Sequence, residues 1–451
     1  MNSETTFFLP LLTESSPQSS NASLETYRDS LSPTASKVLH FEHPFDGSIV
    51  DSHETLTRSW IFTYLAHYNI PTSDHTISLK ELGNHGFLLK SKILEVLQKL
   101  LPRQWRNITD PNVITLTRIT GAMTNMIYKL EANINFKKFS CLLRVYGIGV
   151  EQFVERDREL LCACRLSEQG CAPKLLGVFN NGRFEEFIDS ITLVKENLRE
   201  PKISEIIAKE LAKLHKSIFA MEKEEKNVEL WDKLWDLFDL ASVSNLELKS
   251  KGGNLSKTTG FDLSKIKEEI LHLKKFSAKI DSPVVFAHND LQYGNILQLN
   301  SDKNKLMLVD FEYAAANYRG YDFGNHFCEW AADYHSANPH LLDYTKYPSK
   351  NEQFLFFQSY LKEFNCEKMN YQVTVEELNE IYKETEFYSL LSHIFWGLWG
   401  EVFATLVKFK VSFYFYIGVI QASKSSIDFN YSSYAEQRFT QYFLTKKRLE
   451  L

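Results

Sequence analysis

The chain contains little cysteine, no excess of basic residues, and no apolar run long enough to cross a membrane comfortably. Its six cysteines form no C-x-x-C pair, which argues against a zinc site and suits a reducing compartment, so we expect a cytoplasmic location. The formal net charge of −6 argues against a nucleic-acid-binding surface. The segment MNSETTFFLPLL has neither a basic beginning nor a long apolar core, so we do not expect it to act as a signal peptide.

Aromatic residues, in contrast, are abundant. The 451 residues are enough for two lobes and a sizeable core, and they include 33 Phe, 21 Tyr and 7 Trp. A large core accounts for most of these rings, and a few of them could line a pocket for a cationic ligand.

The most informative stretch runs from Val284 to Trp330. An apolar run leads into His288-Asn289-Asp290, Asn295 follows five residues after Asp290, and a second apolar run (KLMLV) ends at Asp310-Phe311-Glu312. Both aspartates therefore lie where a predicted strand stops and faces a cleft. A carboxylate in such a place can act as a base or a metal ligand without complete desolvation.

The pattern H-x-D-x-x-x-x-N followed by D-F is typical of phosphoryl transfer from ATP. One carboxylate takes the proton of the attacking hydroxyl, while an amide and a second carboxylate hold Mg²⁺ on the phosphates. Asp290 is then the base, and Asn295 and Asp310 supply the oxygen ligands that Mg²⁺ prefers. The alternative is that Asp290 and Asn295 cap a turn and Asp310 merely ends a strand.

Several segments together resemble the choline/ethanolamine kinase family: HND-LQYGN-I, DFEY, N-YRGYDFGNHFCEW and FWGLW. The resemblance covers about residues 112–446, and HFCEW is more similar to choline kinases than to ethanolamine kinases. It implies an α+β, two-lobe protein-kinase-like fold with a small β-sheet lobe and a large, mainly helical lobe. It also implies transfer of the ATP γ-phosphate to choline, Mg²⁺ as cofactor, and phosphocholine as product, which is the first step of the CDP-choline route to phosphatidylcholine. Family members are often dimers, so a homodimer is expected.

Three regions follow from this comparison. Residues 1–55 are rich in Ser, Thr, Asn and Pro and are predicted to be a disordered tail. Residues 56–187 are predicted to hold N-terminal helices and the small nucleotide-binding lobe. Residues 188–451 are predicted to form the large helical lobe, with the catalytic loop and the choline pocket.

Residues 113–130 are predicted to form strand, turn and strand. Gly121 allows close backbone approach, and Thr124 and Asn125 can donate to phosphate oxygens. The turn resembles the nucleotide-covering loop of the family, except that Ala122 stands where members often have a second glycine. A plain hairpin is the alternative interpretation.

An arginine in the apolar strand at 139–145 is also expected near the nucleotide. Arg144 matches a family arginine that reaches the phosphates. An arginine in an otherwise apolar strand is costly without an anionic partner, and a purely structural ion pair is the alternative interpretation. We expect Glu159, on a helix over 151–168, to pair with Arg144, by analogy with kinases; a solvated surface glutamate is the alternative. A hairpin turning at residues 180–182 then leads to Glu186 and Ile188, where the hinge that reads adenine is predicted.

Further residues are predicted to support the catalytic loop. Gln292 should face the nucleotide, together with Asp310, and His288 should brace the loop rather than act as a base. Asp322 should hold the loop by accepting hydrogen bonds from backbone N–H groups. His215, on a helix at 204–219, is expected to be a packed histidine rather than a ligand.

Choline is a quaternary ammonium without N–H donors, so a carboxylate and aromatic faces must bind it. Glu329 is the expected carboxylate, at the start of a helix, and Trp396 and Trp399 lie three residues apart on one helix face. An ordinary helix core is the alternative. The residues that match the choline pocket of the family are Tyr313, Glu329, Tyr334, Trp396, Trp399, Phe429 and Tyr434.

Residues 401–418 depart from the family pattern, in which a segment like VIQASKSSIDF follows FWGLW closely. This apolar, aromatic stretch holds two lysines and is too short for a membrane span. It is either an insertion that extends a helix or an intron read in frame. In either case it separates Trp399 from Phe429 and Tyr434 along the chain.

Other activities remain open at this point. An ethanolamine kinase, or a kinase for both amino alcohols, is the nearest alternative, although the two tryptophans favour choline. An aminoglycoside kinase would need an acidic pocket with few aromatic residues, and a protein kinase would need an A-P-E motif after the second aspartate, which the sequence lacks. A catalytically inactive binding protein is the alternative from another class; Asp290, Asn295 and Asp310 argue against it.

Overall fold

The computed structural model describes residues 61–62, 64–77, 86–119, 125–134, 137–146, 156–217, 228–250, 261–408 and 429–451, without the side chains at 125, 156, 158, 243–250 and 406–408. The predicted tail (1–55), Gly121, Thr124 and the side chain of Asn125 lie outside the described part.

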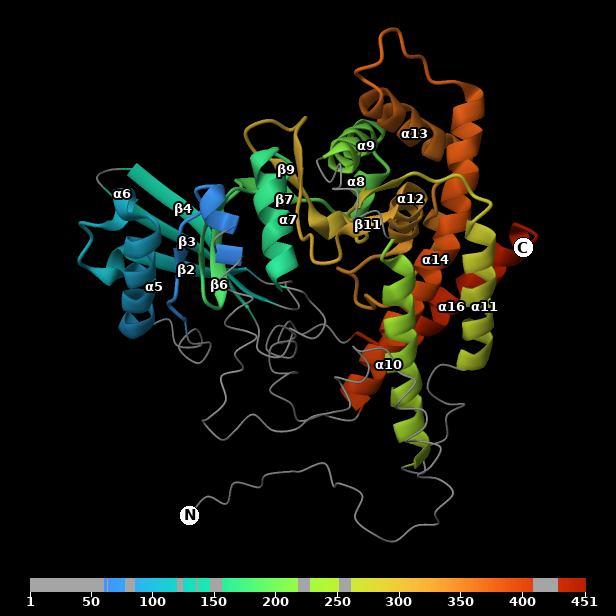
Figure 1. The fold of residues 1–451 in the computed structure, drawn as a ribbon, viewed down its shortest axis with the longest axis horizontal. Coiled ribbons are helices and arrows are strands. Elements are labelled where there is room, and N and C mark those ends of the chain that lie inside the picture. The colour runs from blue at the N-terminus through green and yellow to red at the C-terminus, as the bar shows by residue number, and fades with distance from the viewer. Residues whose placement is uncertain are drawn as a thin grey trace.

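A sheet forms one lobe of the molecule (Figure 1). Among the described residues it has six strands in the order β1-β5-β6-β4-β3-β2, antiparallel except for the pair β1 and β5. The turn at residues 180–182 joins β5 to β6 as predicted, and Gly182 is required there because a Cβ would lie 2.3 Å from the carbonyl oxygen of Arg144. The strands are β1 (Thr72–Ser73), β2 (Ile114–Ile119), β3 (Asn125–Ile134), β4 (Lys137–Tyr146), β5 (Leu175–Phe179) and β6 (Gly182–Glu186).

Helices cover this sheet and bury its apolar side chains. Leu97 and Trp105 belong to one core with Leu130, Leu143 and Phe184 of the strands. A smaller core joins the helix that follows β4 to β5 and to the helical residues 61–62 and 64–67. The elements are α5 (Phe87–Leu100), α6 (Pro102–Trp105), η1 (Pro111–Val113) and α7 (Arg156–Glu168).

Two small sheets connect the first lobe to the helical lobe. One has the strand order β10-β9-β7, and the other pairs β11 with β8. The apolar runs before Asp290 and Asp310 form β8 and β10, as the sequence predicts. The elements are β7 (Ser190–Thr192), β8 (Val284–Ala287), η3 (Tyr293–Asn295), β9 (Ile296–Leu299), β10 (Leu306–Leu308) and β11 (Ala315–Tyr318).

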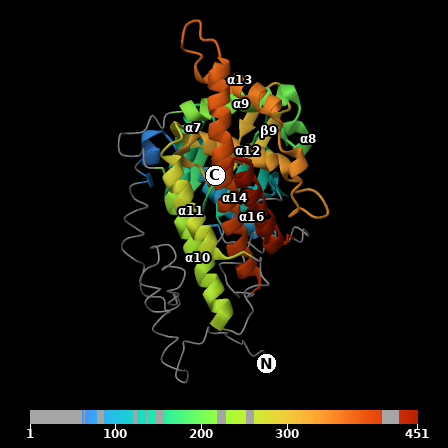
Figure 2. The ribbon, with the colours of Figure 1, turned by 90° about the vertical axis from the view of Figure 1, so that its right-hand side faces the viewer.

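The second lobe is mainly helical and is built around α14 (Val375–Lys408), with α10, α12 and α16 packed against it (Figures 1 and 2). The helices come very close at Gly324, whose Cβ would lie 2.6 Å from the backbone nitrogen of Ser389. The other elements are α8 (Lys195–Leu198), α9 (Pro201–Lys216), α10 (Leu230–Ser250), α11 (Leu263–Ser277), α12 (Arg319–Cys328), η4 (Glu329–Ala331), η5 (Tyr344–Lys346), α13 (Lys350–Phe364) and α16 (Tyr431–Arg448).

One expected helix start was wrong. Glu329 and Trp330 do not begin a helix, because α12 has already run from Arg319 to Cys328 and Glu329 lies in the short 3₁₀ turn η4 that follows it. Residues 401–408 continue α14, and residues 409–418 lie outside the described part.

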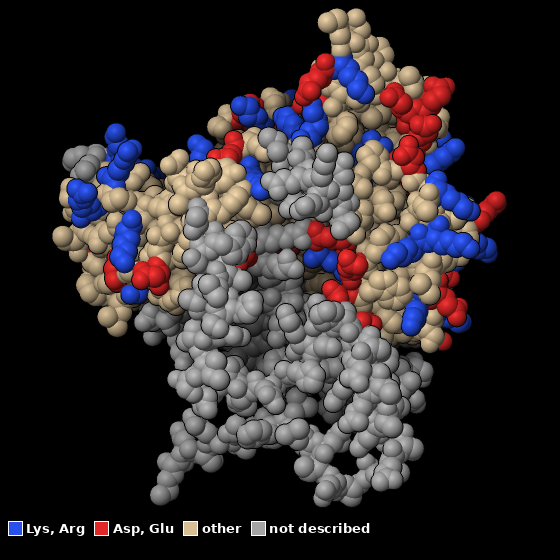
Figure 3. All heavy atoms as spheres, in the orientation of Figure 1, with Lys and Arg blue, Asp and Glu red and all other residues tan. Residues whose placement is uncertain are grey.

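Two observations bear on the charge of the surface and on the length of the helices. On the face seen in Figure 3, Lys and Arg side chains are interspersed with Asp and Glu side chains over the described residues. None of the helices in the described ranges is long and apolar enough to cross a membrane.

Candidate active site

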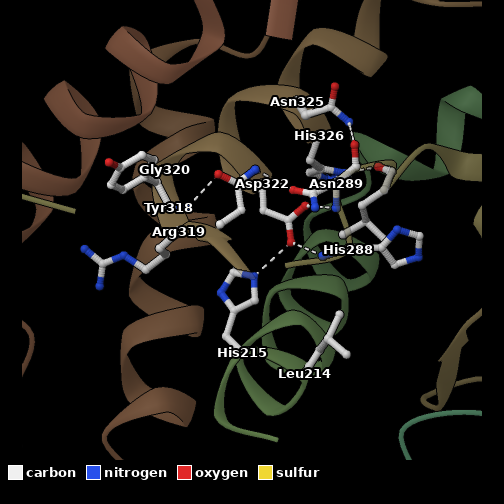
Figure 4. A network of polar contacts seen from close by, with 12 residues as sticks. Leu214, His215, His288, Asn289, Tyr318, Arg319, Gly320, Asp322, Asn325 and His326 are labelled. Carbon is white, nitrogen blue, oxygen red and sulfur yellow. Dashed lines mark hydrogen bonds and ion pairs between the residues drawn. The ribbon is translucent and has the colours of Figure 1, made fainter. Parts of the chain in front are cut away.

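The loop at residues 288–295 is held by Asp322, as the sequence predicts. One carboxylate oxygen of Asp322 accepts a hydrogen bond from the backbone N–H of His288 (2.7 Å), and the other accepts one from that of Asn289 (2.8 Å; Figure 4). Asn289 has a φ of 63°, a left-handed conformation that a non-glycine residue adopts only when its surroundings enforce it. The N-terminal end of α12 therefore fixes the backbone just before Asp290.

His215 and His288 complete the support of this loop. Nε2 of His215, on α9, lies 2.9 Å from Oδ2 of Asp322, and both side chains are buried (Figure 4). His288 uses Nε2 to reach the carbonyl oxygen of Val309 at 3.1 Å, so it braces the loop against the strand end before Asp310. Burial alone would raise the pKa of the Asp322 carboxyl, but the hydrogen bonds from His215 and from the backbone hold that pKa below its usual range.

Asp290 and Asn295 lie together within the loop. Nδ2 of Asn295 donates to the carboxylate of Asp290 (3.0 Å) and to its carbonyl oxygen (2.8 Å), while Oδ1 of Asn295 accepts from Gln292 (3.2 Å). Gln292 is itself fixed because its Oε1 accepts from the N–H of Gly294 at 2.6 Å. Asp290, Gln292 and Asn295 thus form one hydrogen-bonded set within the loop.

Burial raises the pKa of the Asp290 carboxyl well above its usual range, and nearby negative charge raises it further. The contributing carboxylates are, in order, those of Glu329, Asp310 and Glu312, whereas the hydrogen bond from Asn295 has the opposite effect. A carboxyl with a raised pKa is suited to accept a proton near neutral pH.

Asp310 lies next to Asn295, because the N–H of Val309 donates to the carbonyl oxygen of Asn295 at 3.0 Å. Asp310 also has a positive φ, 69°, at the end of its strand. Asn295 and Asp310 offer hard oxygen donors at adjacent positions, which fits Mg²⁺, an ion that takes few protein ligands and completes its shell with water and phosphate oxygens. In the described ranges, no three His, Cys, Asp or Glu side chains form a metal site of their own.

Across from Asp310, the sheet lobe contributes two buried arginines and two buried glutamates. Arg144 on β4 lies 3.6 Å from Glu185 (Nε to Oε2) and 3.9 Å from Asp310 (Nη1 to Oδ1). Arg183 on β6, which pairs in register with Arg144, forms ion pairs with Glu159 (2.8 Å) and Glu185 (2.5 Å). Arg183 therefore takes the place beside Glu159 that we expected Arg144 to take, and this places Arg144 between Glu185 and Asp310.

The predicted hinge follows β6. Glu186 donates its N–H to the carbonyl oxygen of Lys174 at 2.8 Å, and the carbonyl oxygen of Ile188 accepts from the hydroxyl of Ser190 at 3.0 Å. Asn125 begins β3 opposite Tyr146.

The aromatic residues expected around choline lie in one continuous cluster. The ring of Trp396 lies 5.4 Å from Tyr313 and 5.6 Å from Trp399, as measured between ring centroids. Tyr434 lies 6.4 Å from Trp399 and 5.4 Å from Phe429. Trp399 and Tyr434 are neighbours in space although residues 401–418 lie between them in the sequence, because α16 packs against α14. We call the set Tyr313, Tyr334, Trp396, Trp399, Phe429 and Tyr434 the aromatic cluster.

Glu329 contributes a carboxylate to this cluster. It is 2% exposed, accepts a hydrogen bond from the Tyr334 hydroxyl at 2.6 Å, and lies 3.7 Å from Nη1 of the buried Arg438. Burial raises the pKa of Glu329, although Arg438 and Tyr334 counteract the increase. The charge of Glu329 also contributes to the raised pKa of Asp290, so the cluster and the catalytic loop adjoin.

Several residues of the site were not given a role from the sequence: Arg183, Tyr293, Asn325 and Arg438. Asn325 had a detectable signal, since it lies three residues after Asp322 and thus on the same helix face. Arg438 likewise lies one helical turn after Tyr434. No sequence signal indicated the partners of Arg183 or the contact of His215 with Asp322, because these partners lie on distant elements.

Comparison with known proteins agrees with this geometry. A family model described as choline/ethanolamine kinase matches residues 116–443. A protein of Arabidopsis thaliana named probable choline kinase 2 is 36% identical over 375 residues, covering 82% of this chain and 96% of that protein. A second, named probable ethanolamine kinase, is 35% identical over 356 residues, covering 79% and 85%.

Among solved structures, the choline kinase of Cryptosporidium parvum matches with a TM-score of 0.63 and 28% identity, over 80% of this chain and 96% of that one. The fold and these similarities define an ATP-dependent phosphotransferase with the two-lobe protein-kinase-like architecture that the sequence predicts. The chain belongs to the choline/ethanolamine kinase family. This assignment decides against the aminoglycoside-kinase and protein-kinase alternatives.

Proposed function

We propose that the protein is a choline kinase, which transfers the γ-phosphate of ATP to the hydroxyl of choline and releases phosphocholine and ADP. The observation that carries the proposal is the position of Glu329. This buried carboxylate accepts a hydrogen bond from Tyr334 of the aromatic cluster, and the backbone N–H of Tyr334 donates to Tyr293 of the catalytic loop.

Aromatic rings favour choline because a quaternary ammonium offers no N–H donor. It gains attraction from ring faces and from a nearby negative charge, and it needs no hydrogen-bond acceptor. We therefore assign substrate binding to Glu329 and the six rings of the cluster. The order of rings from Tyr313 through Trp396 and Trp399 to Tyr434 and Phe429 supports this assignment.

In the proposed reaction, Asp290 accepts the proton of the choline hydroxyl as its oxygen attacks the γ-phosphorus. A new O–P bond forms, and the bond from phosphorus to the β–γ bridging oxygen breaks, leaving its electron pair on ADP. Asn295 and Asp310 would hold Mg²⁺, which when bound offsets phosphate charge.

Other residues would position the nucleotide. The guanidinium of Arg144 lies beside Asp310 and would supply positive charge to the phosphates of the nucleotide. Gln292 would face the nucleotide from the catalytic loop. Gly121, Thr124 and Asn125 would cover the phosphates, and the backbone at Glu186 and Ile188 would read the adenine edge.

Ethanolamine is the second candidate substrate. The 35% identity to a probable ethanolamine kinase supports it, and Glu329 could accept a hydrogen bond from a primary ammonium. However, one oxygen of Glu329 already accepts from Tyr334 and the other faces Arg438. We therefore rank choline first.

The test compares ATP-dependent phosphorylation of choline and of ethanolamine, using the wild type, Asp290→Asn, and Asp302→Asn as control. Asp302 lies in the turn between β9 and β10 and bonds only to that turn in the hydrogen bonds that the structure records for it. We expect choline to react faster, Asp290→Asn to abolish transfer, and Asp302→Asn to retain it. Faster reaction of ethanolamine would overturn the substrate assignment, and no reaction with either would favour an inactive binding protein.

We also propose a cytoplasmic location and a homodimer. The cysteines, all of which lie in the described residues, are free thiols, as a reducing compartment requires. Light scattering on the purified chain would measure the mass and decide between monomer and dimer.

A further inference from the structure

We infer that the catalytic loop itself fixes the aromatic cluster, through Asn289, Tyr293 and Asn325, and thereby selects amino alcohols with two carbons between oxygen and nitrogen. The inference rests on the proposed function and adds to it a selection by chain length. Three hydrogen-bond connections, two through Asn289 and one through Tyr293, run from residues 288–295 to three members of the cluster.

The first connection passes through Asn325, on α12. Its Oδ1 accepts from the indole N–H of Trp396 at 2.7 Å, and its Nδ2 donates to the carbonyl oxygen of Asn289 at 3.2 Å. Asn325 is fully buried, so water does not compete for either bond. One amide group thus joins a ring of the cluster to the residue before Asp290.

Two side chains strengthen this connection. The hydroxyl of Ser392 also donates to Oδ1 of Asn325, at 2.8 Å, and in turn accepts from Arg438 at 3.1 Å. The same arginine faces Glu329. The amide of Asn325 cannot rotate without breaking bonds on both of its sides, so the position of Trp396 follows that of the loop.

The second connection is made by the side chain of Asn289. Its Nδ2 donates to the carbonyl oxygen of Tyr313 at 2.9 Å, and its Oδ1 accepts from Asn317 at 2.7 Å. With its left-handed backbone, Asn289 thus bonds through its side chain to residues 313 and 317, on the segment that follows Asp310. Tyr313, whose ring touches Trp396, is therefore placed by the same residue that receives the bond from Asn325.

The third connection is made by Tyr293, which is buried at the other end of the loop. Its hydroxyl oxygen accepts from the backbone N–H of Tyr334 at 2.6 Å, and the two rings lie 5.8 Å apart. The Tyr334 hydroxyl then donates to Glu329. The carboxylate expected to face the ammonium is thus also positioned from the catalytic loop.

These connections place the base and the ammonium site in one rigid unit. When the distance between them is fixed, an amino alcohol with the right spacing brings its hydroxyl to Asp290, whereas a longer one does not. A misplacement of about 1 Å can cost about 100-fold in rate. Choline has two carbons between oxygen and nitrogen, and 3-hydroxypropyl-trimethylammonium has three.

The test measures kcat/KM for these two compounds at saturating ATP, together with the KM for ATP. The variants are Tyr293→Phe, which removes a single oxygen atom, and Asn325→Leu, which keeps a similar side-chain volume but removes the hydrogen bonds of the side-chain amide to Asn289 and Trp396. Tyr442→Phe is the matched control, since Tyr442 is as buried as Tyr293 and donates to Glu269 at 2.5 Å, on helices α16 and α11 away from the loop.

We expect Tyr293→Phe and Asn325→Leu to lower the preference for choline over the longer compound by at least about threefold, with the KM for ATP nearly unchanged. Tyr442→Phe should keep the wild-type preference. An equal loss on both compounds in both variants would overturn the inference, because a merely structural role lowers the two activities alike. If the wild type does not phosphorylate choline, the proposed function fails; if it does and the preference does not change, only the chain-length inference fails.

Discussion

Nε2 of His215 lies 2.9 Å from Oδ2 of Asp322, and neither side chain is exposed to solvent. The contact joins the end of α9 to the beginning of α12, although 107 residues separate the two in sequence. It also orients the Asp322 carboxylate so that both of its oxygens reach the backbone of the catalytic loop. The geometry before Asp290 therefore depends on a charged group that the substrate is not expected to touch.

Replacing Asp322 with Asn should destabilise the fold by about 3 kcal/mol at neutral pH, because one partner of a buried, hydrogen-bonded set is lost. The pKa of Asp322 is lower in the folded than in the unfolded chain, so its contribution is complete above the unfolded value of about 3.9 and declines as the pH falls below it. Urea unfolding at neutral, mildly acidic and strongly acidic pH measures the free-energy difference between wild type and variant.

That difference should be the same at neutral and mildly acidic pH and smaller below the unfolded pKa. Asp302→Asn serves as the control, and it should remain close to the wild type throughout. A difference that increases as the pH falls would contradict the assigned sign.

Arg183 should be essential for the stability of the sheet lobe. In Arg183→Met, Glu159 and Glu185 lose the buried cation that they share, and we expect a loss of about 3–5 kcal/mol in the free energy of unfolding. The KM for ATP should also rise, because Arg144 would be drawn toward the two carboxylates and away from Asp310. Denaturant unfolding and steady-state kinetics measure the two effects.

Two variants sharpen the Arg183 experiment. Arg183→Lys keeps the charge but lacks the planar fork that serves two carboxylates, so it should fall between wild type and Arg183→Met. Lys137→Met, at an exposed position on β4, should leave both quantities nearly unchanged. A normal KM for ATP in Arg183→Met would show that Arg144 keeps its position without its neighbour.

Features that depend on nearby residues could be predicted from the sequence. The apolar runs that end at Asp290 and Asp310, the five-residue spacing to Asn295, and the turn at 180–182 are all local, and the structure has them as expected. The role of Asp322 could be predicted because a buried carboxylate beside a loop commonly accepts hydrogen bonds from the backbone N–H groups of that loop.

Features that depend on the pairing of residues far apart in the sequence could not be predicted. Arg144 and Arg183 are cross-strand neighbours only because β4 and β6 pair in one particular register, so the partner of Glu159 was not evident. The start of α12 was missed because Gly320 and Gly324 lower helix propensity. Their purpose is contact with α14, where any Cβ would overlap Tyr388 and Ser389. Glu329 consequently lies after a helix rather than at the beginning of one.

Chelation of metal should stop phosphoryl transfer without unfolding the protein. EDTA should abolish activity and added Mg²⁺ should restore it, while the unfolding midpoint of the nucleotide-free protein stays the same, because Asn295 and Asp310 are not a structural site. Loss of a group that only orients a metal ligand costs about 10- to 100-fold in metal affinity. Asp310 is itself a proposed ligand, so Asp310→Asn should raise the Mg²⁺ concentration needed for half-maximal activity at least about tenfold. Asp302→Asn should leave it unchanged, and a fall in the midpoint with EDTA would contradict this account.

Phe403 tests whether the segment 401–418 supports the aromatic cluster. Its ring lies 4.3 Å from Trp399 and 5.6 Å from Tyr431, and it belongs to the part of the segment that extends α14. An aromatic pair contributes about 0.5–1.5 kcal/mol, so Phe403→Ala should raise the KM for choline by about two- to tenfold. The KM for ATP should not change, because Phe403 contacts the rings of Trp399 and Tyr431 and not the residues proposed to bind the nucleotide.

Phe354→Ala is the matched control for Phe403→Ala, since Phe354 is also half-buried on a helix and contacts Tyr382 rather than the cluster. It should lower stability without raising the KM for choline. If Phe403→Ala also leaves that KM unchanged, the extension of α14 lies outside the ammonium site and Trp399 keeps its position without it. If both KM values rise together, Phe403 supports the lobe as a whole. A rise for choline alone would mean that the residues inserted after Gly400 have become part of the wall that binds the substrate.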